Sequence, residues 1–130
     1  MRTIGHFIGG QHVAGTSGRA SPVYNPSTGE VQAELSLATQ AEVTAAVANA
    51  AEAQPKWAAT NPQRRARVMM KFVDLLNQNM EELAQLLSSE HGKTVPDAKG
   101  DILRGLEVAE FSIGVPHLMK GEFTDGAGPA

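Results

Sequence analysis

The spacing of apolar residues changes near residue 39, and this change constrains the fold more than any other feature. Between Val31 and Leu37 apolar and polar residues alternate, a period of two that is typical of a half-buried antiparallel strand. Between Val43 and Ala50 apolar residues recur at i, i+3, i+4 and i+7, which places them on one face of a helix. The pattern therefore predicts strands and turns over residues 1–38 and helices over residues 39–121.

The first region contains the signals of a small antiparallel hairpin. Gly9-Gly10 separates two short segments, and a Gly-Gly pair is a common two-residue hairpin turn. Residues 25–29, Asn-Pro-Ser-Thr-Gly, are dense in turn formers and precede the alternating strand.

Capping residues predict where the helices begin and end. The expected starts are Thr39 with Glu42, Asn61 with Pro62, and Asn79 with Glu82. Pro55 is expected to disturb the end of the first helix, and Trp57 to anchor that end to the core. Gly92 is the expected stop of the third helix.

The last helix is predicted from Pro96 to about Met119, with a kink at Gly114-Val115-Pro116. It is apolar on more than one side: one stripe is Ile102, Leu106, Ala109 and Ile113, and another is Val108, Phe111 and Val115. Such a helix is expected between layers of structure. Its glycines, Gly100, Gly105 and Gly114, would each cost about 1 kcal/mol relative to Ala, so close neighbours are expected there. Residues 122–130 are Gly-rich and expected to be mobile.

Arg104 is the candidate site residue because it heads the stripe of Val108, Phe111 and Val115. A half-buried guanidinium needs an anionic partner. One interpretation is an ion pair with Asp101 or Glu107, each three residues away. The other is that Arg104 faces a cavity and binds a substrate carboxylate through two hydrogen bonds.

Several classes of function are disfavoured by composition. A net charge of −3 argues against nucleic acid or an anionic membrane as the main partner. The chain has no cysteine, so it offers no disulfide, thiolate metal site or cysteine nucleophile. No apolar run reaches the roughly 18 residues of a membrane span, and the N-terminus lacks signal-peptide character. We therefore expect a cytoplasmic protein.

Motifs for metal or phosphate binding are weak. Gly92-Lys93-Thr94 resembles the end of a phosphate-binding loop, but Leu87 occupies the position of the first glycine. The four histidines have no metal-binding spacing. Neighbouring basic residues, namely Arg64, Arg65, Arg67 and Lys71, are interpreted as a solvated helix face or, alternatively, a domain or subunit contact. We assign no catalytic, cofactor-binding or metal-ligating residue in this chain.

The order of short motifs, however, resembles the N-terminal part of the aldehyde dehydrogenase superfamily. These motifs are IGG, YNPSTGEV, NPQRRARVM, EHGK, DILRGLEVAEF and HLMKGE. Within the superfamily, HGKT, RGLEVAEF and PHLMKGE look most similar to the CoA-acylating methylmalonate-semialdehyde dehydrogenases. The resemblance covers about residues 7–121.

The resemblance implies a three-layer α/β parent fold, of which this piece is mostly α-helical with an N-terminal antiparallel β-hairpin and strand region. It also implies that residues 39–121 belong to the cofactor-binding domain. The parent would oxidise an aldehyde through a cysteine adduct, use NAD and CoA, and form a homo-oligomer. Arg104 falls on the arginine thought to bind the carboxylate of malonate or methylmalonate semialdehyde.

The resemblance also implies what is missing, because the catalytic cysteine and most of the NAD site have no matching positions here. We expect the 130 residues alone to be inactive, to bind neither cofactor tightly and to self-associate through uncovered apolar faces. Two alternatives remain: a non-catalytic helical interaction module, and a piece of another subfamily, such as one acting on succinate semialdehyde. The coding sequence beyond Ala130 would distinguish the interaction module from the enzyme. Substrate profiling of the full-length protein, with and without CoA, would distinguish the subfamilies.

Overall fold

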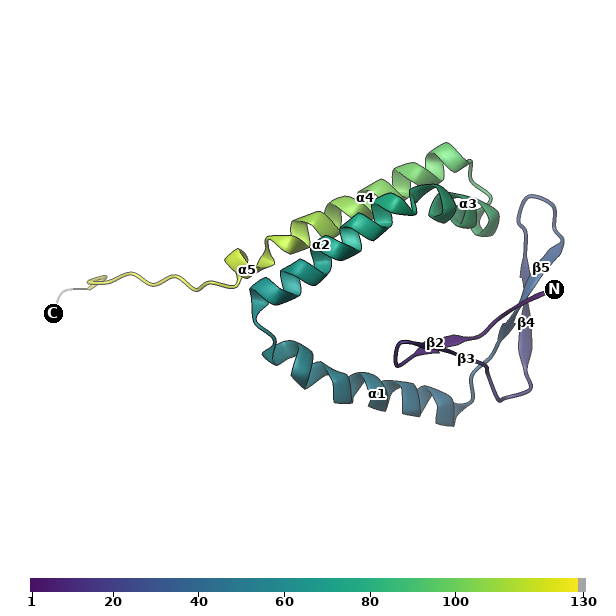
Figure 1. Ribbon diagram of the computed structural model, residues 1–130, viewed down its shortest axis with the longest axis horizontal. Coiled ribbons are helices and arrows are strands. Elements are labelled where there is room, and N and C mark those ends of the chain that lie inside the picture. Colours follow the sequence, from purple (N-terminus) through teal and green to yellow (C-terminus); the bar gives the residue numbers. More distant parts are fainter. Residues whose placement is uncertain (129–130) are drawn as a thin grey trace.

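The computed structural model describes residues 1–128, and within them all the strands precede all the helices (Figure 1). The strands are β1 (Arg2–Ile4), β2 (His6–Ile8), β3 (Gln11–Val13), β4 (Ala20–Tyr24) and β5 (Val31–Ser36). The helices are α1 (Gln40–Ala59), α2 (Pro62–Gln78), α3 (Met80–His91), α4 (Val95–Ile113) and α5 (Val115–Leu118). Strand structure thus gives way to helix between Ser36 and Gln40, where the period of the apolar residues changes.

The strands form two small sheets. β2 and β3 pair in an antiparallel hairpin whose turn is Gly9-Gly10, both at positive φ (62° and 78°), which confirms the predicted turn. The other sheet has the order β1-β5-β4. β5 is antiparallel to β4, as its alternation predicts, but it is also parallel to β1, and alternation alone gives no sign of that pairing. Ala33, at the middle of β5, is fully buried.

The start of α1 is held by the predicted capping box. The Thr39 hydroxyl accepts from the Glu42 N–H at 3.1 Å, and the Glu42 carboxylate accepts from the Thr39 N–H at 2.7 Å. Both the N–H and the hydroxyl of Thr16 also donate to Glu42, each at 2.8 Å. These hydrogen bonds, led by that from the Thr39 backbone, lower the pKa of Glu42 from 4.5 to about 2. Glu42 therefore links the loop before β4 to the first turn of α1.

The end of α1 differs from expectation. Pro55 does not break the helix, which continues to Ala59. A proline removes one backbone N–H donor. Because Pro55 lies near the end of α1, the residues after it still complete the last turn, in which the Thr60 N–H donates to Trp57 O. Trp57 is half exposed and is not a core anchor. Most of α1 lies apart from α2, α3 and α4 (Figure 1), and none of its residues is buried. At the end of α1, Trp57 only lines a cavity beside α2, α4 and α5.

The helical core lies where α4 packs against α2 and α3 (Figure 1). Its buried residues are mostly small: Ala66, Ala84, Ala98, Leu106 and Ala109. Small side chains allow helices to approach closely, and Leu106 and Ala109 belong to the predicted stripe of the last helix. The predicted kink is confirmed as a break at Gly114, which separates α4 from α5.

The prediction for Asn79 is wrong. Its side chain does not cap α3; its amide instead donates to Leu75 O at 2.8 Å and closes the end of α2. The backbone of Asn79 (φ −109°, ψ 14°) is not in the extended conformation that an N-cap residue adopts.

Gly92 ends α3 as predicted, in the left-handed conformation with φ 86°. A Cβ atom there would lie 3.0 Å from Pro26 Cγ, so the turn between β4 and β5 packs directly against this helix end. Two polar contacts support the same junction. Gln32 Nε2 donates to Ser89 O at 3.1 Å, and Arg2 Nη2 forms an ion pair with Glu90 Oε1 at 3.7 Å.

The glycines inside α4 contradict the expectation of close neighbours. Nothing lies within 4 Å of a Cβ atom built at Gly100 or Gly105. The described part of the chain places no other element over these two positions, and Gly105 instead lines an apolar depression between α2, α3 and α4.

Many large apolar side chains are exposed, including Val47, Val108 and Phe111. None of the helices described over residues 1–128 is both long and apolar enough to cross a membrane. Residues 122–128 form no helix or strand; of the tail predicted to be mobile, residues 129 and 130 lie outside the described residues.

Candidate functional site

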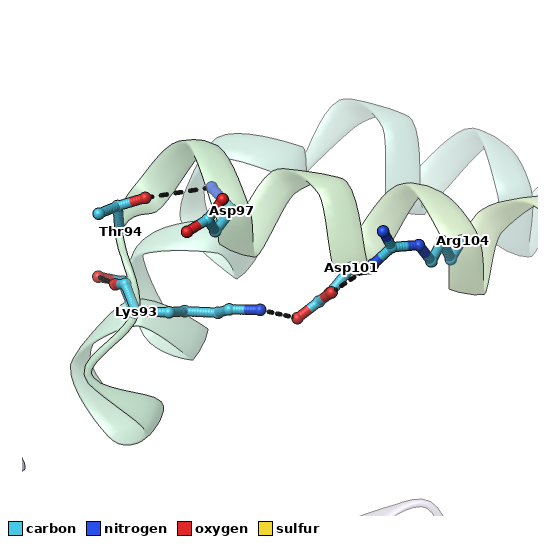
Figure 2. A network of polar contacts seen from close by, with 6 residues as sticks. Lys93, Thr94, Asp97, Asp101 and Arg104 are labelled. Atoms are coloured by element: carbon cyan, nitrogen blue, oxygen red, sulfur yellow. Dashed lines mark hydrogen bonds and ion pairs between the residues drawn. The ribbon is translucent and has the colours of Figure 1, made fainter.

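The candidate site begins in the three-residue loop between α3 and α4. Gly92 turns the chain, and the Ser88 hydroxyl donates to Lys93 O at 2.6 Å. Thr94 then caps α4, its hydroxyl accepting from the Asp97 N–H at 3.3 Å (Figure 2). Each residue of the Gly-Lys-Thr sequence thus has a local structural partner, and the loop follows a helix instead of a strand. Both observations argue against a phosphate-binding loop.

Asp101 lies between two cations (Figure 2). Lys93 Nζ donates to Asp101 Oδ2, and Arg104 Nη1 donates to Asp101 Oδ1 at 2.8 Å. The Lys93 hydrogen bond is the main cause that lowers the pKa of Asp101, and the charges of Lys93, Arg104 and His91 act in the same direction. Exposure increases along the series, from 19% for the Lys93 side chain to 41% for Asp101 and 78% for Arg104.

The structure corrects the expectation that Arg104 is half-buried. Its guanidinium points back along α4 to Asp101, one turn earlier, as long side chains on a helix commonly do. The intrahelical ion pair considered from the sequence is therefore present, with Asp101 as the partner. Glu107, the other residue considered, forms no ion pair within residues 1–128.

The apolar stripe that follows Arg104 on α4 is present, but its side chains Val108 and Phe111 are exposed. Val108 is 66% exposed and Phe111 is 70% exposed, so the guanidinium heads an apolar strip that faces outward. A cation beside apolar surface suits a ligand with a carboxylate at one end and carbon atoms behind it. The exposure also shows that α4 is not covered on this side by any described residue.

A separate cavity of about 190 Å³ lies at the other end of α4. Its walls include Trp57, Arg65, Met69, Ser112 and Met119. Arg65 Nε is buried without a hydrogen-bond partner among the described residues, and Nη2 contacts Met119 Sδ at 3.9 Å. Arg65 therefore differs from a freely solvated arginine. Its position four residues before Met69, which places the two side chains on the same face of α2, is the signal that could have shown this.

No metal centre is formed within residues 1–128, where no three His, Asp or Glu side chains converge. Of the sequence-predicted site residues, Arg104 and Asp101 are brought together. The sequence does not predict the contact of Lys93 with Asp101, because a helix start separates the two residues and no simple spacing connects them.

The comparisons with known proteins define the class. Residues 12–129 match the aldehyde dehydrogenase family, and the chain belongs to that family. The solved structures that resemble it share the aldehyde dehydrogenase fold, which confirms the expected fold class.

More specific similarity is to semialdehyde dehydrogenases. The chain is 46% identical over 121 residues to malonate-semialdehyde dehydrogenase 2 of Geobacillus thermodenitrificans, covering 93% of this chain and 25% of that protein. It is 69% identical (TM-score 0.92) to a Sinorhizobium meliloti structure assigned as a methylmalonate-semialdehyde dehydrogenase in complex with NAD, covering 99% of this chain and 26% of the other. For the methylmalonate-semialdehyde dehydrogenase of Oceanimonas doudoroffii the identity is 44% and the TM-score 0.91, over 99% and 26% of the two chains. The chain thus spans about a quarter of the length of the relatives it matches.

Proposed function

We propose that this chain serves as the N-terminal part of an NAD-dependent, CoA-acylating dehydrogenase of malonate or methylmalonate semialdehyde, and that Arg104 binds the carboxylate of the substrate. The observation that carries the proposal is the exposed guanidinium of Arg104 at the head of an apolar strip. The similarity to semialdehyde dehydrogenases supports the substrate class.

Arg104 retains the donors that the proposal requires. A guanidinium has five N–H donors, and its planar edges match a carboxylate in bidentate geometry. Asp101 accepts a hydrogen bond from Nη1, which leaves the Nη2 and Nε donors for a substrate. Covering Val108 and Phe111 with further protein would exclude water and strengthen this charged contact.

The chemical step requires residues from outside this chain. The chain has no cysteine, so it supplies no thiolate to attack the aldehyde. Residues 1–128 also do not fit an NAD site by themselves: the Gly-Lys-Thr loop follows α3, a helix, and its lysine is bound to Asp101. A dinucleotide site is instead built from a strand, a Gly-rich turn and a helix. The contribution proposed for these residues is recognition of the carboxylate.

The test is steady-state kinetics of Arg104→Leu in the full-length enzyme. We expect the KM for malonate semialdehyde to rise by about tenfold or more, because a charged hydrogen-bonded contact is lost. The kinetics with propanal, which has no carboxylate, should be unchanged. An equal loss of activity with both aldehydes would show that Arg104 has only a structural role. A preference of the wild-type enzyme for succinate semialdehyde over malonate semialdehyde would indicate the other subfamily.

The exposed apolar residues favour a second candidate, a helical interaction module or subunit contact. Val47, Val68 and Phe111 are each more than half exposed, on α1, α2 and α4 respectively. Homo-oligomerisation of a full-length enzyme and docking of its own further domains would both cover such residues. Detection of the same 130 residues as a separate product in cells, with no longer form carrying a cysteine nucleophile, would favour the module.

A further inference from the structure

The contact between Lys93 and Asp101 matters for Arg104, and the inference drawn from it rests on the function proposed above. Asp101 carries one negative charge and is bound by two cations, Lys93 and Arg104. The cluster therefore keeps a net charge of +1. Without Lys93, Asp101 and Arg104 would form an isolated pair with no net charge, and the attraction for an incoming anion would weaken.

We infer that Lys93 is a positioning residue for carboxylate recognition: by binding Asp101 Oδ2, it limits Asp101 to one hydrogen bond with Arg104 and keeps the guanidinium available to an anionic substrate. A carboxylate with both oxygens free can bind an arginine through two parallel hydrogen bonds. In this structure Lys93 occupies the second oxygen (Figure 2), so Arg104 donates to Asp101 through Nη1 alone.

The backbone around Lys93 is well fixed, which suits such a role. Gly92 adopts a left-handed turn at the end of α3, Ser88 binds the Lys93 carbonyl at 2.6 Å, and Thr94 caps α4. The Lys93 side chain then runs along the start of α4 to Asp101 (Figure 2) and is only 19% exposed. A partly buried, anchored lysine loses less entropy on pairing than a free surface lysine, so its contact with Asp101 should persist.

Lys99 provides a matched control. It lies on α4 two residues before Asp101 and pairs with Glu81 of α3. Lys99→Met therefore removes one positive charge and one ion pair close to the same junction of α3 and α4. It leaves the Lys93–Asp101–Arg104 series intact.

The experiment is a kinetic comparison of Lys93→Met, Lys93→Arg and Lys99→Met in the full-length enzyme, each also combined with Arg104→Leu. We expect Lys93→Met to raise the KM for malonate semialdehyde by about two- to fivefold, the range of a partly exposed charge contact. The kcat should be retained and propanal oxidation unchanged. Lys93→Arg and Lys99→Met should behave as wild type. In the Arg104→Leu background Lys93→Met should have no further effect, because Lys93 acts through Arg104.

The inference is overturned if Lys93→Met matches Lys99→Met, if it impairs propanal equally, or if its effect persists without Arg104. Lys93→Gln, measured in parallel with the thermal midpoint of each variant, guards against misfolding. If neither Lys93→Met nor Lys93→Gln folds, Lys93 is a structural residue and the inference also falls. A selective effect of Arg104→Leu with none of Lys93→Met removes this inference alone, whereas a non-selective Arg104→Leu removes the proposed function as well.

Discussion

At Arg104 the intrahelical ion pair considered from the sequence is present and leaves room for the proposed substrate contact. Its Nη1 donates to Asp101, which is a structural ion pair within the helix, yet most of its side chain is exposed. An arginine with several donors can keep one intramolecular contact and still bind a ligand. The intrahelical pair therefore does not count against recognition of a substrate.

Arg104 could be singled out from sequence because its helical spacing to apolar residues is a local property. Its exposure could not, because it depends on which other parts of a protein cover α4. The contact of Lys93 with Asp101 could not be predicted for a related reason: the left-handed turn at Gly92 redirects the chain, and the direction of a side chain after such a turn is not encoded in a periodic pattern.

Glu42 gives a pH-dependent prediction at the residue scale. Its pKa in the folded chain is about 2, below the ordinary 4.5. The charged form therefore stabilises the fold above about pH 4.5, and this contribution is lost as the pH falls toward 2. In Glu42→Gln the free energy of unfolding of the 130-residue chain should fall less over this range, as measured by urea denaturation at several pH values.

Glu52→Gln, at an exposed position of the same helix, controls for the loss of one carboxylate. If the acid-dependent loss of stability is the same in Glu42→Gln as in wild type, the hydrogen bonds from Thr39 and Thr16 do not stabilise the fold in the way described.

At the scale of elements, the junction between α3 and α4 combines a local contact, the Thr94 cap, with a long-range contact between Gly92 and Pro26. Helix ends were predictable where a side chain satisfies its own neighbouring backbone, as at Thr39 and Asn61. The prediction for Asn79 was wrong because its side-chain amide can donate to the last turn of the preceding helix as easily as its oxygen can cap the next helix. The parallel pairing of β1 with β5 was not predicted, because it joins segments about thirty residues apart and strand periodicity does not specify a partner.

A pair of glycine substitutions tests this junction. Gly92→Ala should destabilise the chain by about 1–3 kcal/mol, since alanine is disfavoured at positive φ and its Cβ would crowd Pro26. Gly100→Ala, inside α4 with open space at its Cβ, should stabilise it by about 0.5–1 kcal/mol. Denaturant unfolding of both variants gives the comparison. A similar effect of the two substitutions would contradict the assigned conformation of Gly92.

At the scale of the whole molecule, the exposed apolar surface is the dominant feature. Most of α1 lies apart from the other helices, and α4 packs on α2 and α3 (Figure 1). No residue of α1 is buried, and Val108 and Phe111 of α4 are exposed. The chain matches about a quarter of its relatives' length. Within residues 1–128 no other element covers these exposed apolar side chains. This arrangement explains why the helices were predictable individually while their environment was not.

The central claim, that Arg104 binds a substrate carboxylate in a complete dehydrogenase, is tested most directly by inhibition with propionate. Propionate has the carboxylate and carbon chain of malonate semialdehyde but no aldehyde, so it reports binding without chemistry. With propanal as the substrate of the full-length enzyme, propionate should be a competitive inhibitor whose Ki rises by about tenfold or more in Arg104→Leu. Inhibition by the uncharged 1-propanol should not change. An equal Ki for propionate in wild type and Arg104→Leu would contradict the account.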